Sequence, residues 1–241
     1  MKKSKRIFAF ILIITLLCFA VIYYGMYFFG LSGLHSNTEY IDGQIKVACI
    51  GDSTTYGHGI KNWKNNNYPA LLQKELGDDF CVVNFGMNGS TAQSFGDQPY
   101  IKNEICKKSI EFNADIIVFM LGTNDSKDEN FRSTGDFKKE YSELINKYFE
   151  NSNTPEIYLC TPTAAFYING KTNDPAKFDV DIENIGKIAQ SVKELSEERE
   201  FGLIDINSLT AMHPEWFEKD GVHPNNEGAQ EIAKAVANII K

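Results

Sequence analysis

The sequence predicts an α/β domain on a parallel sheet, preceded by one N-terminal transmembrane helix. From residue 45 onward, short apolar runs alternate with helical periods, a pattern typical of βαβ units. Before them, residues 7–34 contain no charge. The composition, 43% hydrophobic and 23% charged over 241 residues, excludes disordered, collagen-like and coiled-coil chains. A mean hydropathy of −0.29 with a single long apolar run excludes a polytopic membrane protein.

The apolar stretch predicts an uncleaved signal anchor. As a helix, residues 7–29 would rise about 35 Å, enough for a hydrocarbon core of about 30 Å. Signal peptides have a shorter apolar region and then a small-residue cleavage site, which is absent here. Aromatic residues typical of a membrane interface crowd its far end: Tyr23, Tyr24, Tyr27, Phe28 and Phe29. The basic residues among 2–6 would stay in the cytoplasm, which places the remainder outside it on a single-pass membrane protein.

Two alternatives to the anchor remain open. A long signal peptide cut within residues 32–35 would give a secreted protein. Lipidation at Cys18 is disfavoured by Leu17, because a small residue is needed there. We expect four segments: a cytoplasmic tail at 1–6, the anchor at 7–34, a linker at 35–44 and one domain at 45–241.

The domain is acidic. The chain has 24 basic and 32 acidic residues, and four of the basic ones lie within residues 2–6. The remainder therefore holds 20 basic and 32 acidic residues, a net charge of −12. Such a domain would repel phosphates, which excludes nucleic acid as a partner and favours an uncharged substrate.

The cysteines do not suggest a metal centre. Cys49, Cys81 and Cys160 lie in or beside apolar runs and are expected to be buried free thiols, whereas Cys106 has a more polar setting. No C-x-x-C occurs and no Cys/His spacing suits zinc. We expect neither a metal nor another cofactor.

Five apolar runs predict the buried strands, at residues 45–50, 80–84, 115–121, 156–160 and 202–206. Three helical periods show apolar residues recurring at three and four: Phe137, Tyr141, Leu144, Ile145 and Tyr148; Phe178, Ile182, Ile185, Ala189, Val192 and Leu195; Ala229, Ile232, Ala233, Val236 and Ile240. Ligands of parallel sheets bind at the carboxyl ends of the strands, so the residues that follow each strand are candidates for a site.

Polar motifs follow the first three predicted strands. Ser53 stands in Gly-Asp-Ser-Thr after the first, at or near a helix N-terminus where backbone N–H groups favour a developing negative charge. Residues 84–90 after the second contain two glycines three apart, which allow the backbone to approach a ligand closely. Asn124, after the third, can donate an amide N–H toward the same edge.

A fourth motif precedes the last helical period. His223 follows Asp220 by three residues, which allows the carboxylate to orient the imidazole, and histidine is the usual general base near neutral pH. Each motif alone is also typical of a helix cap or a turn, and for Gly51-Asp52-Ser53 alone the cap is the more common case. Together they supply a nucleophile, oxyanion donors, a base and an orienting carboxylate, the set that acyl transfer needs.

These motifs resemble the four blocks of the SGNH/GDSL hydrolase family of esterases and lipases. The blocks match in the family's order, over about residues 45–240, as Gly51-Asp52-Ser53, Asn84-x-Gly86-x-x-Gly89, Gly122-x-Asn124-Asp125 and Asp220-x-x-His223-Pro224. Thr54 stands where the family name has Leu, a position that varies within the family.

The resemblance implies a flavodoxin-like three-layer α/β/α sandwich with a five-stranded parallel sheet. It also implies that Ser53 is the nucleophile, His223 the base and Asp220 the residue that orients the base. The oxyanion hole would consist of the Ser53 and Gly89 backbone N–H groups and the Asn124 side chain, and no cofactor would be needed.

Other readings of the same residues fit less well. The G-x-S-x-G elbow of α/β-hydrolases and the phosphate-binding G-x-x-x-x-G-K-[ST] are absent. A metal phosphoesterase would need several histidines at its metal site, but the whole chain has only four: His35, His58, His213 and His223. His58 is expected only to line the cleft. A binding module on an inactive scaffold is disfavoured because every catalytic position is filled.

The substrate is expected to be a short-chain acyl ester, an O-acetyl group on a carbohydrate, hydrolysed through an acyl-Ser53 intermediate. Residues 56–68 and 90–100 are rich in polar side chains, and Trp63, Tyr68 and Tyr100 could stack on sugar rings. Residues 68–72 and 96–100 also resemble family members grouped with carbohydrate acetylesterases. The alternatives are a lysophospholipase or short-chain lipase, and an O-acyltransferase with the same triad.

Overall fold

The computed structural model describes residues 14–15, 40–150, 154–167 and 177–241. The chain separates into two units, Met1–Gly33 and Leu34–Lys241, and almost all described residues belong to the second. The expected anchor at 7–34 therefore lies outside the described residues apart from Ile14 and Thr15. Among the described residues, no helix has the length and apolar character to cross a membrane. Membrane attachment stays a prediction.

A five-stranded parallel sheet forms the centre of the second unit, as the sequence predicts. Its order is β2-β1-β3-β4-β5, and every neighbouring pair is parallel. The strands are β1 Ile45–Gly51, β2 Phe80–Gly86, β3 Ile116–Met120, β4 Glu156–Cys160 and β5 Gly202–Ile204. Buried on both faces, β1 and β3 are nearly continuous apolar runs, as interior parallel strands are.

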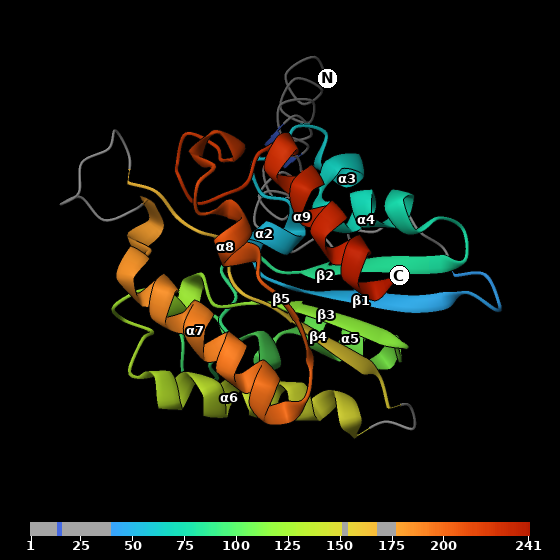
Figure 1. The fold of residues 1–241 in the computed structure, drawn as a ribbon, viewed down its shortest axis with the longest axis horizontal. Helices are drawn as coiled ribbons and strands as arrows, with labels where there is room; N and C mark the ends of the chain where they lie inside the picture. The colour runs from blue at the N-terminus through green and yellow to red at the C-terminus, as the bar shows by residue number, and fades with distance from the viewer. Residues whose placement is uncertain (1–13, 16–39, 151–153, 168–176) are drawn as a thin grey trace, which may run out of the picture. The chain divides into compact units, whose positions relative to one another are not determined.

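Helices cover both faces of this sheet and make three layers (Figure 1). Alternate strand residues point to the two faces, so that Ala48 and Ile50 enter one core cluster and Val47 and Cys49 the other. The first cluster packs against α5 Glu104–Glu111, α6 Thr134–Asn146 and α7 Ile182–Arg199. The second packs against α4 Tyr68–Leu76, α8 Ile206–Thr210 and α9 Asn226–Ile240.

Short elements complete the connections. They are the single-turn helices α2 Ser53–Tyr56 and α3 Trp63–Asn66 and the 3₁₀ turns η1 Tyr100–Lys102, η2 Asn124–Ser126, η3 Lys147–Phe149, η5 Lys177–Asp179 and η6 Pro214–Trp216.

Side-chain caps fix where the long helices begin. Ser133 accepts the N–H of Asp136 at the start of α6, and Asn225 accepts two N–H groups at the start of α9. Asp181 accepts the N–H of Asn184 and starts α7 at Ile182. The helical period that we began at Phe178 is therefore wrong at its first residue, because Phe178 has a φ of 66° and lies outside the helix.

The four cysteines of the described domain are free and buried. This agrees with the expectation for Cys49, Cys81 and Cys160. The expectation of a more polar setting for Cys106 is wrong, because α5 turns this residue into the core, where its Sγ lies 3.8 Å from the Tyr148 hydroxyl. Burial raises the pKa of the Cys49 thiol to about 12, so this group is an unreactive apolar filler.

The strand register aligns the carboxyl ends of the first three strands. Gly51 at the end of β1 pairs with Gly86 of β2 and with Met120 of β3. The chain after β1 crosses directly over β2, so that a Cβ atom on Gly86 would collide with the backbone nitrogen of Tyr56. Glycine is required there by close approach of two backbones.

This contact predicts opposite effects for two glycine substitutions. Gly86→Ala should lower the free energy of unfolding by about 1–3 kcal/mol, because backbone must shift to admit the methyl group. Gly186→Ala should raise it by about 0.5–1 kcal/mol, because Gly186 is exposed within α7 with no atom near its Cβ position. Urea denaturation of both variants measures the two effects. Equal stability of the two variants would contradict the crowding of Gly86.

Candidate active site

Ser53 lies directly after β1, at the first residue of α2. Asp52 caps this helix, and its side chain accepts the N–H of Thr54 at 2.9 Å. The cap holds the turn that presents Ser53 at the carboxyl edge of the sheet. Both side chains are buried.

His223 reaches Ser53 from the loop before α9. Its Nε2 lies 2.9 Å from the Ser53 Oγ, and its Nδ1 lies 2.9 Å from the Asp220 Oδ2. The other oxygen of Asp220 accepts the N–H groups of Val222 and His223, both at 2.9 Å. The structure thus joins Ser53, His223 and Asp220 in one chain of hydrogen bonds.

The protonation of this chain follows from Asp220. Burial favours a raised pKa, but hydrogen bonds from His223 and from two backbone N–H groups outweigh it and lower the pKa of Asp220 to about 2. An ionised carboxylate only accepts, so the Nδ1 of His223 must donate to it. In a neutral imidazole the Nε2 is then an acceptor, directed at the Ser53 hydroxyl.

Gly89 and Asn124 lie at the same edge of the sheet. Gly89 follows β2 with a φ of 77°, a left-handed conformation that glycine adopts without strain. Asn124 follows β3 in η2, and its side-chain amide donates to the carbonyl oxygen of Ser90 at 3.1 Å. This bond uses one of two amide hydrogens and ties the loop of Gly89 to the loop of Asn124.

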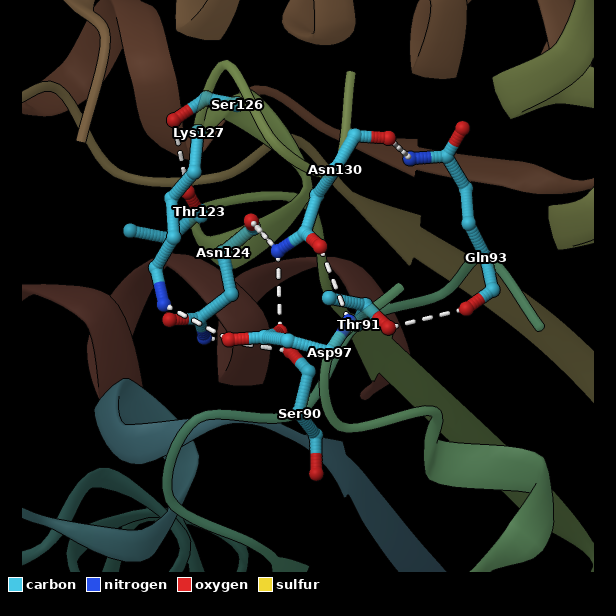
Figure 2. Close-up of polar contacts among 9 residues, drawn as sticks. All are labelled: Ser90, Thr91, Gln93, Asp97, Thr123, Asn124, Ser126, Lys127 and Asn130. Carbon is cyan, nitrogen blue, oxygen red and sulfur yellow. Dashed lines mark hydrogen bonds and ion pairs between the residues drawn. The ribbon is translucent and has the colours of Figure 1, made fainter. Parts of the chain in front are cut away.

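A second asparagine, Asn130, bonds the backbone of Asn124 (Figure 2). The Asn130 amide donates to the Asn124 carbonyl at 2.8 Å and to the Asp97 carboxylate at 2.9 Å. Its oxygen accepts the N–H of Asp97 at 2.9 Å, and Lys127 pairs with the same carboxylate at 3.3 Å. Sequence reasoning missed Asn130, because it lies outside the four motifs and a single loop asparagine carries no pattern.

Asp125 fixes the loop that contains Ser90. Its two carboxylate oxygens accept the N–H groups of Ala92 and Gln93, each at 3.0 Å. Burial raises the pKa of Asp125 to about 6 in spite of these bonds, and it does the same for Asp52 beneath Ser53. Two buried carboxyl groups therefore support the site with pKa values well above the ordinary range.

The aromatic residues expected to stack on sugars are not all accessible. Tyr68 packs in the core cluster between the sheet and helices α4 and α9, and Tyr100 is buried with its hydroxyl bonded to the Phe85 carbonyl at 2.8 Å. The expectation is wrong for both, because these rings fill apolar layers. Trp63 is half-buried and stacks on the Tyr56 ring at 4.9 Å.

The sequence profile of the GDSL-like Lipase/Acylhydrolase family matches residues 49–231. The chain belongs to this family. Lipases and acylhydrolases, the enzymes for which this family is named, cleave carboxylic esters.

A family relative, an acetylxylan esterase from Xylanibacter ruminicola, is 33% identical over 214 residues. The match covers 82% of this chain but 43% of that protein, so the chain spans less than half of the relative's length. Two solved structures share the fold. A carbohydrate acetylesterase from Sinorhizobium meliloti is similar with a TM-score of 0.65 at 17% identity, over 81% of this chain and 97% of that one. A lipase/acylhydrolase from Enterococcus faecalis gives 0.62 at 18% identity, over 81% and 94%.

The family's catalytic roles stay predictions for Ser53, Asp220, His223, Gly89 and Asn124, although the structure gathers these residues at one edge. His58, expected in the cleft, contacts His223 with ring centroids 4.5 Å apart.

Within the described part of the chain, no three His, Cys, Asp or Glu residues are grouped so that they could hold a metal ion.

The raised pKa of Asp125 predicts a pH dependence of stability. From about pH 4 to about pH 6 the folded chain retains a proton that the unfolded chain has released, so the contribution of Asp125 to the free energy of unfolding falls as the pH rises and is constant above. Asp125→Asn lacks this titration. The wild-type value minus the Asp125→Asn value should therefore fall by about 1 kcal/mol per pH unit within that window. Urea denaturation across it measures the difference, and a difference independent of pH would refute the shift.

Proposed function

We propose that this chain hydrolyses short-chain acyl esters, O-acetyl groups on a carbohydrate, through an acyl-Ser53 intermediate. The hydrogen-bonded chain from Ser53 through His223 to Asp220 carries the proposal, because it supplies a nucleophile with a base already in contact. The acetylxylan esterase relative supports the acetyl group and the carbohydrate.

In the first step, the Ser53 Oγ attacks the ester carbonyl carbon while the His223 Nε2 takes its proton. The carbonyl oxygen becomes an oxyanion, which the Ser53 and Gly89 backbone N–H groups and the Asn124 amide would stabilise. Asp220 remains ionised and stabilises the imidazolium that forms. When the intermediate collapses, His223 returns the proton to the alcohol oxygen, the carbon–oxygen bond to the alcohol breaks, and acyl-Ser53 is left.

Water completes the reaction from the same geometry. His223 takes a proton from water as its oxygen attacks the acyl carbon, and the second tetrahedral intermediate uses the same oxyanion donors. Collapse releases the carboxylic acid and returns the proton to Ser53. An alcohol in place of water would make the chain an acyltransferase, so water access decides between the two activities.

The location of this activity is a separate proposal. The uncharged stretch at 7–34 and the basic residues before it support a single-pass anchor with the enzyme outside the cytoplasm. An envelope or external glycan would then be within reach. Cell fractionation and protease protection of the full-length chain test this placement, and release of a shortened soluble form would favour a cleaved signal peptide.

Replacement of Asn124 tests the oxyanion hole. We expect Asn124→Ala to lower kcat on acetyl esters about 10²–10³-fold, because one oxyanion donor contributes that much. The lost bond to Ser90 should lower the free energy of unfolding by about 1 kcal/mol, so urea denaturation is measured in parallel. Asn66→Ala, at a half-buried position in α3, serves as the control. Near-wild-type turnover would remove Asn124 from the hole.

A series of p-nitrophenyl esters of rising acyl length tests the reaction and its acyl preference. We expect the full chain to hydrolyse the acetate ester fastest, because the proposed substrate carries an acetyl group. Ser53→Ala should lose this activity. A preference for long chains would retain the triad and shift the substrate to lipids. A folded chain with no turnover on any ester would favour a dedicated transferase, which product analysis with a sugar acceptor would detect.

A further inference from the structure

The His223 ring has an aromatic neighbour that belongs to none of the four motifs. Phe178 of η5 meets it edge to face, with ring centroids 5.2 Å apart and planes at 72°. Phe178 is 44% exposed, whereas His223 is buried. A solvent-accessible apolar ring therefore lies in contact with the proposed general base.

The backbone holds this ring in an uncommon conformation. Phe178 has a φ of 66° and Asp179 a φ of 60°, both in the left-handed region that bulky side chains rarely adopt. An exposed phenylalanine does not compensate such strain by burial. Strained residues of this kind cluster where a side chain must be presented to a ligand.

The contact between Phe178 and His223 indicates which part of an ester substrate would lie beside the Phe178 ring. The carbonyl oxygen must face the oxyanion donors, Gly89 and Asn124. The alcohol oxygen must instead lie within hydrogen-bond reach of the His223 Nε2, from which it receives its proton. A ring packed on His223 is therefore beside the alcohol half of the substrate.

We propose that Phe178 is a specificity-determining residue whose exposed ring packs against the leaving alcohol, a pyranose sugar. This inference rests on the proposed function. A pyranose presents a face of C–H groups that removes apolar area from water when it covers an aromatic ring. The Lys177 ammonium lies over the Phe178 ring, 5.2 Å from its centroid, and would donate to the hydroxyls of a sugar that packs on the rest of this ring.

Two acetates that differ only in their alcohol test the proposal. With the full chain, Phe178→Ala should lower kcat/KM for a mono-acetylated xyloside about tenfold. For ethyl acetate, whose alcohol has no ring, kcat/KM should stay within about twofold of wild type. Acetyl-Ser53 and its hydrolysis are common to both substrates, so the difference isolates the alcohol half. Phe178→Tyr retains the ring and should restore the xyloside activity.

Tyr40→Ala is a matched control. Tyr40 is also 44% exposed and has a lysine ammonium, that of Lys46, 5.6 Å from its ring centroid. It precedes β1 and so lies toward the sheet edge opposite Ser53. This variant should leave kcat/KM unchanged on both acetates.

The outcomes separate this inference from the proposed function. An equal fall on both acetates would mean that Phe178 only orients His223, and an unchanged xyloside activity would mean that the ring is not used; either result overturns the inference. If the wild type cleaves ethyl acetate but no acetylated xyloside, the carbohydrate substrate fails. Cyclohexyl acetate then supplies the ring alcohol, and a selective loss in Phe178→Ala would still support the alcohol-side role, whereas no selective loss would overturn it.

Discussion

The hydrogen bond between Ser53 and His223 joins residues 170 positions apart, and the alignment of parallel strands makes it possible. β2 pairs with one edge of β1, and β3 pairs with the other edge. The loops that follow these strands therefore run to opposite sides of β1. Crevices of α/β sheets form where loops separate in this way. Ser53, Gly89 and Asn124 each follow one of these strands. The loop of His223 closes the site from the start of α9, which packs on the same face as α4.

The sequence predicts well the elements and contacts whose residues lie close together along the chain and form a recognisable pattern. Buried parallel strands are continuous apolar runs, and the Asp220–His223 contact spans only three residues. Asn130 and Asp97 could not be paired in this way, because 33 residues separate them and polar loop residues usually face solvent. Periodicity also extended one helix to Phe178, where the Asp181 cap in fact decides the start. Tyr68 and Tyr100 were assigned to a cleft because no local pattern distinguishes a core tyrosine from an exposed one.

The three carboxylates of the site show how burial and hydrogen bonding compete. Asp220 is partly exposed and accepts two N–H groups and an imidazole, so hydrogen bonds set its pKa at about 2. Asp125 also accepts two N–H groups, but it is fully buried and senses the charge of Asp52, so desolvation dominates. Asp220 is thereby ionised in the pH range where His223 would act as a base under the proposed mechanism. Asp52 and Asp125 hold the turns of Ser53 and Ser90, and their ionised forms lower stability in exchange for fixed geometry.

The proposed catalytic residues and Phe178 are attached to the fold in different ways, which suggests how one scaffold can keep its chemistry and change its substrate. Gly89 and Asn124 lie on loops that follow β2 and β3, and the bonds of Asn130 and Asp125 hold these loops in place. Under the proposed mechanism, substitution there would disturb bond-making itself. Phe178 is attached differently: it contacts the His223 ring in a T-shaped arrangement and lies in a strained turn before α7 rather than at a strand end. A residue so placed can change without displacing Ser53 or Asn124. Selection for a new alcohol would therefore act first on this turn, whereas selection for a new acyl group would have to act on the more constrained side near Gly89 and Asn124.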